Sequence, residues 1–287
     1  MTALMAGMPV HDEERGVHHM AEAHVEPVIR IEKVCFGYGT KLVIDNVDVD
    51  IDAGQFVSLI GPSGCGKSTL LAMLDGMASP DSGSILVNGQ APRPGDPDRA
   101  MVFQNFALMP WKTVLSNVEL GLRYRRPELA KKGRREIARH FLDKVGLSSA
   151  ADLYPHNLSG GMQQRVGLAR AFAVEPSIML MDEPFGALDA QNAEILREEL
   201  RSLVAEENRT IVFVTHNLDE AIQLSDRILL MSAGPSRIRD DIRVELPEVH
   251  SAEYVSRYDR YREHLWDHLR HEVETVQQRE REGGGAS

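Results

Sequence analysis

The chain has 287 residues, of which 43% are hydrophobic and 26% charged, a balance typical of a soluble globular protein with one large domain or two small ones. Its formal net charge of −11 argues against a broad nucleic-acid interface, because such interfaces present a basic face to the phosphate backbone. The two cysteines, Cys35 and Cys65, are too few for a disulfide framework and favour a reducing cytosol. We expect no nucleic-acid partner.

Residues 1–27 contain glycine, proline, acids and four histidines without any hydrophobic period, and they make a poor signal peptide. This composition predicts a mobile, solvated tail, and a metal-binding tail is the alternative. The longest apolar runs of the chain are the length of strands, well short of the roughly 20 residues that a membrane-spanning helix needs. We therefore expect no membrane crossing.

The first half of the chain alternates strands with one short helix. Alternating or continuous apolar residues predict strands at 28–39, 54–61, 84–89 and 101–104. The second of these strands leads directly into a glycine-rich loop. Residues 68–77 then predict a helix that stops near Gly76.

Residues from about 105 to 165 change character and predict a helical subdomain inserted between strands, with Ile137, Phe141 and Val145 on one helical face. The continuous apolar runs 177–182 and 210–216 suit strands that are buried on both faces of a parallel sheet. A helix with leucines at helical spacing separates these two runs. Strand, helix, strand is the order of an α/β fold.

The last segment, 248–287, predicts a long amphipathic helix and a flexible end. Its apolar residues recur every three or four positions, which predicts packing on the core or on a partner. This stripe consists of Tyr254, Tyr258, Tyr261, Leu265, Leu269, Val273 and Val276.

The stretch GPSGCGKST, residues 61–69, is typical of a phosphate-binding loop. Gly61 and Gly66 allow backbone N–H groups to turn toward phosphate oxygens, and the helix that follows adds the positive end of its dipole. Lys67 would reach the β- and γ-phosphates, while the Ser68 hydroxyl would ligate Mg²⁺. The other predicted nucleotide contacts of the loop are Ser63, Gly64, Cys65 and Thr69. We also hypothesise that alkylation of the Cys65 thiol blocks nucleotide binding.

Polar residues end three other predicted strands, and ligands of parallel sheets bind at the carboxyl ends of the strands. Asp182 suits a magnesium carboxylate, and Glu183 can polarise an attacking water. Gln104 can orient the metal and that water, and His216 can hydrogen-bond the γ-phosphate. The alternatives to these catalytic roles are purely structural: an aspartate that caps a helix and a hydrogen-bonded histidine at the sheet edge.

The octapeptide LSGGMQQR, residues 158–165, adds a second anion-binding helix start. Ser159 is placed as the N-cap, and Gly160 and Gly161 leave backbone N–H groups open to an anion. This octapeptide resembles the signature motif of ABC-type ATPases.

That resemblance covers residues 28–240 and implies ATP and Mg²⁺ as ligands. GPSGCGKST corresponds to Walker A, Gln104 to the start of the Q-loop and IMLMDEP to Walker B, with Glu183 as the catalytic glutamate. GALD ends the D-loop at Asp189, and His216 corresponds to the switch histidine. Gln163 belongs to the signature contacts. Tyr38 fits the place of an adenine-stacking aromatic, with Phe36 as its rival.

The resemblance implies a P-loop NTPase fold: a RecA-like α/β core with an antiparallel β edge, plus the inserted helical signature subdomain. We expect residues 1–27 as the tail, 28–247 as the ATPase domain and 248–287 as the carboxyl-terminal segment. In this family two domains join head to tail around ATP. A second copy of the chain would therefore supply Ser159 and Gly161 to complete each site.

Three stretches, DEPFGALD, MPWKTVLSNVELGL and SAGPSRI, resemble the importer ATPases of the nitrate, sulfonate, taurine and bicarbonate group. That group implies separate membrane permease subunits, a secreted solute-binding protein and a peripheral location on the cytoplasmic face of the inner membrane. Phe106, Leu108 and Trp111 are candidates for lining the permease groove, or equally for subdomain core. Asn217 and Asp75 depart from the group's pattern. The alternative function is an ATPase of an exporter, a lipid-handling complex or a soluble assembly system.

Overall fold

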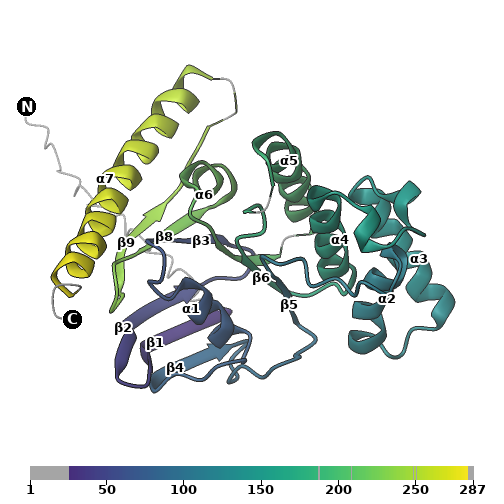
Figure 1. Ribbon diagram of the computed structural model, residues 1–287, viewed down its shortest axis with the longest axis horizontal. Helices are drawn as coiled ribbons and strands as arrows, with labels where there is room; N and C mark the ends of the chain where they lie inside the picture. The colour runs from purple at the N-terminus through teal and green to yellow at the C-terminus, as the bar shows by residue number, and fades with distance from the viewer. Residues whose placement is uncertain (1–25, 187, 208, 248, 250, 284–287) are drawn as a thin grey trace, which may run out of the picture.

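A computed structural model describes residues 26–186, 188–207, 209–247, 249 and 251–283. Its smaller sheet is antiparallel and has the strand order β2-β1-β4 (Figure 1). The strands are β1 (Ile29–Tyr38), β2 (Lys41–Ile51) and β4 (Ser82–Val87). This sheet is the antiparallel part that the sequence predicts beside the nucleotide-binding core.

The larger sheet has the strand order β5-β6-β7-β3-β8-β9 and is parallel except for β9. Its strands are β3 (Phe56–Ile60), β5 (Arg99–Val102), β6 (Ile178–Asp182), β7 (Thr210–Val214), β8 (Arg227–Met231) and β9 (Ile238–Arg243). Because β3, β5, β6 and β7 are parallel, their carboxyl ends meet at one edge of the sheet. The residues that follow those ends are thereby brought together.

Both faces of the central strands β3, β6 and β7 are buried, as the continuous apolar runs predict. Side chains alternate between the faces: Val212 and Val214 pack toward helix α1 (Lys67–Leu74), whereas Ile211 and Phe213 pack toward the helical side. The helix α1 shares its core with the small sheet, so it lies between the two sheets (Figure 1). The helix α5 (Ala190–Glu207) packs into the core of the opposite face.

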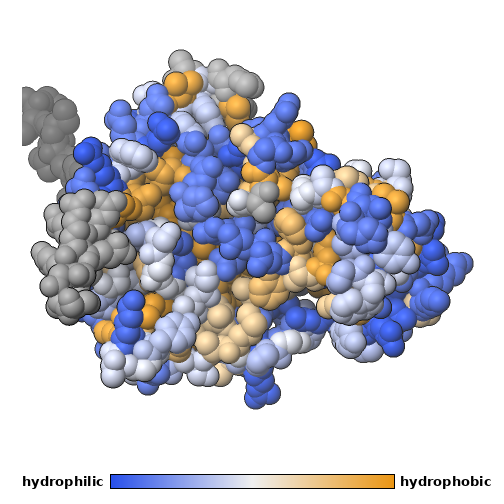
Figure 2. Space-filling model, viewed as in Figure 1, coloured by the Kyte–Doolittle hydropathy of each residue, from blue (hydrophilic) through white to orange (hydrophobic). Residues whose placement is uncertain are grey.

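The helical subdomain comprises α2 (Val114–Arg125), α3 (Lys131–Lys144) and α4 (Gly160–Ala173), with 3₁₀ turns at Ser148–Ala150 and Pro155–Asn157. It extends away from the sheets at the right of Figure 1. The face of α3 that the sequence predicts is apolar, since Phe141 and Val145 are buried and Ile137 packs against them. Its outer surface is largely hydrophilic (Figure 2).

At the other end of the molecule, α6 (Leu218–Leu224) and α7 (Ala252–Gly283) cover β8 and β9. The predicted stripe of α7 faces the body: Leu265 is fully buried, and Tyr258, Tyr261 and Leu269 pack around it. Val273 is more exposed, and the side chain of Val276 lies outside the described residues, as do the histidines of residues 1–25. Among the described residues, no helix is long and apolar enough to cross a membrane.

Candidate nucleotide site

The loop between β3 and α1 is built on glycines that the surrounding backbone requires. Gly66 is the N-cap of α1 and has a φ of 103°. A Cβ atom there would lie 3.0 Å from side-chain carbons of both Val43 and Ile44, because β2 presses against the loop. At Gly61 an added Cβ would lie 2.7 Å from the carbonyl oxygen of Met231. A side chain would clash with backbone at Gly61 and would be crowded and strained at Gly66, in agreement with a loop that must keep its N–H groups turned inward.

Lys67 is the first residue of α1, and its ammonium group is held within the loop. Its Nζ donates to the carbonyl oxygens of Gly61 at 2.8 Å and Pro62 at 2.9 Å. These contacts hold the charged group at the loop that the sequence predicts to bind phosphate. The buried stem leaves little freedom for the group to point elsewhere.

Ser68 and Asp182, two of the three residues predicted at the magnesium site, come together although 114 positions separate them. The Ser68 hydroxyl donates to Oδ1 of Asp182 at 3.0 Å. Burial raises the pKa of the Asp182 carboxyl, and the hydrogen bond from Ser68 opposes that rise. A hydroxyl and a carboxylate at this distance form an oxygen donor pair of the kind that Mg²⁺ prefers.

Glu183 stands at the centre of the three predicted catalytic residues. Its Oε2 accepts a hydrogen bond from the Gln104 amide at 3.2 Å and lies 3.3 Å from Nδ1 of His216. The three residues follow the neighbouring strands β5, β6 and β7. The backbone of Glu183 is in the left-handed region, with a φ of 44°, a conformation that is costly for a non-glycine residue.

A pocket of about 360 Å³ contains much of the predicted nucleotide site. Eight of the site residues that the sequence predicts line this pocket: Tyr38, Ser63, Gly64, Gly66, Lys67, Ser68, Thr69 and Glu183. Tyr38 is 62% exposed and its hydroxyl lies 3.4 Å from that of Thr69, whereas Phe36 packs against the core. This arrangement favours Tyr38 over Phe36 as the aromatic that a base could contact.

Two residues that the sequence analysis missed, Lys41 and Val43, also line this pocket. Both belong to β2, which pairs with β1 and places Lys41 opposite Tyr38. The feature of the sequence that could have indicated this position of Lys41 and Val43 is the Gly39-Thr40 turn, which joins β1 to β2.

The signature residues lie apart from this pocket, since none of the described ones lines it. Ser159 is the N-cap of α4, as predicted, and its hydroxyl accepts from the N–H of Met162 at 3.3 Å. Gln163 donates its amide to the carbonyl oxygens of Pro155 and Leu158. Gly161, the second glycine of the motif, faces Asn192 at the start of α5.

Asn192 links the signature to the D-loop residue Asp189. Its backbone and side-chain N–H groups donate to the Asp189 carboxylate at 3.0 and 2.7 Å, and these bonds lower the pKa of that carboxyl. Asp189 therefore caps the beginning of α5. Gly160, the first glycine of the signature motif, is the first residue of α4. The Asp189 side chain remains exposed.

The structure argues against a reactive Cys65. The side chain is 1% exposed and packs in the core beneath the loop, away from the pocket. Burial raises the pKa of the thiol, although the nearby Lys67 opposes that rise. A buried thiol with a raised pKa is a poor nucleophile, so the proposed alkylation has no accessible target.

The three candidate permease-contact residues divide between the surface and the core. Trp111 is 72% exposed, whereas Leu108 packs against the helical core and Phe106 is half-buried. Arg170 of α4 donates to the carbonyl oxygens of Phe106 at 3.1 Å and Ala107 at 2.7 Å. The segment after Gln104 is thus fastened to the helix that begins at the signature motif.

The fold and these grouped residues define a P-loop ATPase. The family model described as ABC transporter matches residues 44–186. An uncharacterised ABC transporter ATP-binding protein of Methanocaldococcus jannaschii is 43% identical over 230 residues, which cover 80% of this chain and 85% of the relative. The chain belongs to the ABC transporter family of ATP-binding proteins.

Relatives with named transport roles match nearly as well. The nitrate import ATP-binding protein NrtD of Synechococcus elongatus is 42% identical, covering 73% of this chain and 76% of that protein. The bicarbonate transport ATP-binding protein CmpD of the same species is 40% identical, covering 82% of this chain and 87% of that protein. The dimeric structure of a bacterial ABC transporter cassette matches with a TM-score of 0.68 and 34% identity, over 76% of this chain and 99% of the cassette.

Proposed function

We propose that this protein hydrolyses ATP to drive a binding-protein-dependent importer of a small organic or inorganic anion. The observation that supports this most directly is the carboxylate of Glu183, which lines the phosphate-loop pocket, accepts a hydrogen bond from Gln104 and lies 3.3 Å from Nδ1 of His216. The importer assignment is supported by the similarity to the nitrate and bicarbonate ATP-binding proteins.

In this proposal ATP occupies the pocket at the phosphate loop. The Lys67 ammonium and the loop N–H groups bind the phosphates, with Cys65 and Gly61 contributing backbone only, and Tyr38 stacks on the base. Mg²⁺ would be held by Ser68 and Asp182, with Gln104 beside them, and it would neutralise charge on the phosphate oxygens. The 3.0 Å separation of the Ser68 hydroxyl and the Asp182 carboxylate supports this ligand pair.

Glu183 would accept the proton of the attacking water, because its Oε2 is the acceptor on which the other two side chains converge. Gln104 would orient the carboxylate through its amide N–H. His216, which is 65% exposed at its side chain, would be free to turn toward the γ-phosphate. The protein would supply positioning and electrostatics, which dominate phosphoryl transfer.

The separation of the signature from the pocket supports a head-to-tail homodimer. Ser159 and Gly161 would then bind the ATP held by the partner's Walker A loop, with the start of α4 as the anion site. The match to a cassette whose solved structure is dimeric supports the same arrangement. Binding and hydrolysis would close and open this dimer as a population shift.

Permease subunits would dock near the Q-loop, where Trp111 is exposed on a segment fastened to α4 by Arg170. In this proposal the protein is a peripheral subunit at the cytoplasmic face of the inner membrane. Residues 28–247 would form the ATPase domain, with 248–287 as an appended segment. A secreted binding protein would deliver the anion.

The test is reconstitution of the protein in proteoliposomes with the permease and binding protein encoded beside its gene. We expect ATP hydrolysis to rise when the binding protein is loaded with nitrate, bicarbonate or a sulfonate, and to stay basal with the unloaded binding protein. Export of solute without any binding protein, or an ATPase rate that no loaded binding protein changes, would contradict the importer role.

A further inference from the structure

Three side chains with metal-binding chemistry meet where α7 crosses the edge strand β9. They are Asp240 of β9 and His264 and His268 of α7, and one ligand atom of each lies within 4.8 Å of the others. The two histidines are four positions apart, so they occupy one face of the helix, and their ring centroids are 4.3 Å apart. Two histidines at this spacing on a helix form the zinc-binding pair of the H-E-x-x-H motif. The nucleotide site uses none of these residues.

The hydrogen bonds around two of the side chains are those that metal ligands need. Nδ1 of His268 lies 2.8 Å from the backbone oxygen of His264, which can only accept, so Nδ1 carries the proton. The neutral ring then has its lone pair on Nε2. Oδ1 of Asp240 accepts the backbone N–H of Asp241 at 2.9 Å, which leaves Oδ2 to act as a ligand. Such outer hydrogen bonds orient histidine and carboxylate ligands in known metal sites.

The third side chain is held by the bond that a metal would replace. Nε2 of His264 lies 2.7 Å from Oδ2 of Asp240. Because an ionised carboxylate oxygen can only accept, the proton of this hydrogen bond belongs to Nε2. A metal ion needs about 2.0–2.2 Å to each ligand, so the two atoms must separate slightly as the ion enters. The proton leaves Nε2 for Nδ1 of the same ring or for water, and the lone pair of Nε2 then binds the metal.

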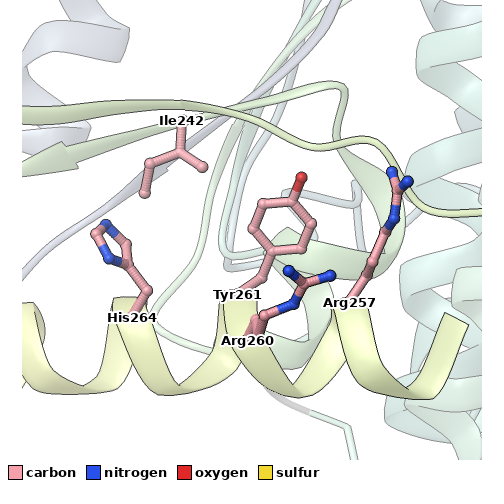
Figure 3. Close-up of a pocket in the computed structure, with 5 residues that line it drawn as sticks. All are labelled: Ile242, Arg257, Arg260, Tyr261 and His264. Carbon is pink, nitrogen blue, oxygen red and sulfur yellow. The ribbon is translucent and has the colours of Figure 1, made fainter. Parts of the chain in front are cut away.

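An ion can reach these atoms from solvent. His264 also lines a pocket of about 480 Å³ between α7 and β9, together with Ile242, Arg257, Arg260 and Tyr261. Figure 3 shows the His264 ring rising from α7 toward the strand that carries Ile242. The side chains of His264 and Asp240 are 46% and 30% exposed. Arg257 is paired with Glu253 at 2.7 Å, which offsets part of the positive charge at the far side of the pocket.

We propose that Asp240, His264 and His268 bind a divalent transition metal of the zinc class, with water as the fourth ligand. Two imidazoles and one carboxylate suit Zn²⁺, Co²⁺ or Ni²⁺, whereas Mg²⁺ prefers oxygen ligands alone. The metal would cross-link α7 to β9. Another polar anchor of α7 near this point is the Glu272 carboxylate, which accepts the N–H of Ala233 at 2.7 Å.

The test is a titration of the metal-free full-length protein with Zn²⁺ by calorimetry, and with Co²⁺ by visible absorption, in the presence of millimolar Mg²⁺. His264→Ala/His268→Ala should bind one equivalent less than the wild type and lose the Co²⁺ band. Asp240→Asn should weaken binding at this site by at least the roughly 10- to 100-fold that loss of an outer-shell partner costs. Zn²⁺ should also raise the Tm of the wild type more than that of the double variant.

His271→Ala is the matched control, because His271 is an exposed histidine of the same helix outside the cluster. It should keep both the stoichiometry and the Co²⁺ band. The amino-terminal histidines remain in all variants, so any metal they bind cancels in the comparison. Circular dichroism and the metal-free Tm establish that each variant is folded. Equal stoichiometry in wild type and the folded double variant, or an equal loss in His271→Ala, would overturn the assignment.

Discussion

Nδ1 of His216 lies 3.3 Å from Oε2 of Glu183, the same oxygen that accepts the Gln104 amide at 3.2 Å. One carboxylate oxygen thus connects residues that follow three different strands. Glutamine has nearly the same shape as glutamate. A glutamine at position 183 therefore removes the proton-accepting carboxylate with little change in the shape of the site.

Glu183→Gln should therefore lower the rate of ATP hydrolysis by about 10²- to 10⁴-fold, the range for loss of a general base. Nucleotide affinity should stay within a few-fold of wild type, and ATP should trap a dimer detectable by gel filtration. Lys67→Ala is the contrasting variant, because loss of the ammonium should weaken nucleotide binding itself. A Glu183→Gln protein that hydrolyses ATP at the wild-type rate would refute the role given to this carboxylate.

Thiol reagents should label Cys35 well before Cys65. Cys35 is partly exposed, while the Cys65 thiol is buried and has a raised pKa. Peptide mapping by mass spectrometry after timed alkylation measures both rates, and Cys35→Ser isolates the slow site. Fast labelling of Cys65 in the folded Cys35→Ser variant would show that the loop opens more than the structure indicates.

Asn217→Ala should lower the free energy of unfolding by about 1 kcal/mol. The Asn217 side chain caps α6 by accepting from the N–H groups of Asp219 at 2.9 Å and Glu220 at 3.4 Å. Asn217→Asp keeps an acceptor at the helix start and should be nearly neutral. Urea unfolding of the three proteins tests this, and equal losses in both variants would exclude the capping role.

Arg170→Lys should lower the free energy of unfolding by about 1.5 kcal/mol, because lysine lacks the two separate guanidinium nitrogens that bond the carbonyl oxygens of Phe106 and Ala107. Chemical denaturation measures the loss. The exposed Arg139 of α3 provides the control, since Arg139→Lys removes no hydrogen bond in the described structure. If the two lysine variants are equally stable, Arg170 does not fasten the segment after Gln104.

The sequence predicted the parallel strands β3, β5, β6 and β7 because their signal is local, but it did not predict the parallel strand β8. Each run such as 178–182 or 210–214 is continuously apolar, and a strand buried on both faces requires that. The helix α5 and the stripe of α7 followed from spacing alone. By contrast, β9 escaped prediction, because the segment IRDDIR is polar and its pairing with β8 depends on residues distant in sequence.

By itself, the sequence determined the chemistry of this protein: the order and spacing of the phosphate loop, the strand-end acids and the signature motif identify an ABC-type ATPase. Those residues are chemically specific, so their identities are visible without a fold. Only the tertiary structure decided which of them meet. Parallel pairing brings Gln104 and His216 to one carboxylate oxygen of Glu183. Packing buries the Cys65 thiol in the core. The crossing of α7 over β9 brings Asp240 close to His264 and His268. Such distances depend on packing between distant segments, which local sequence patterns do not encode.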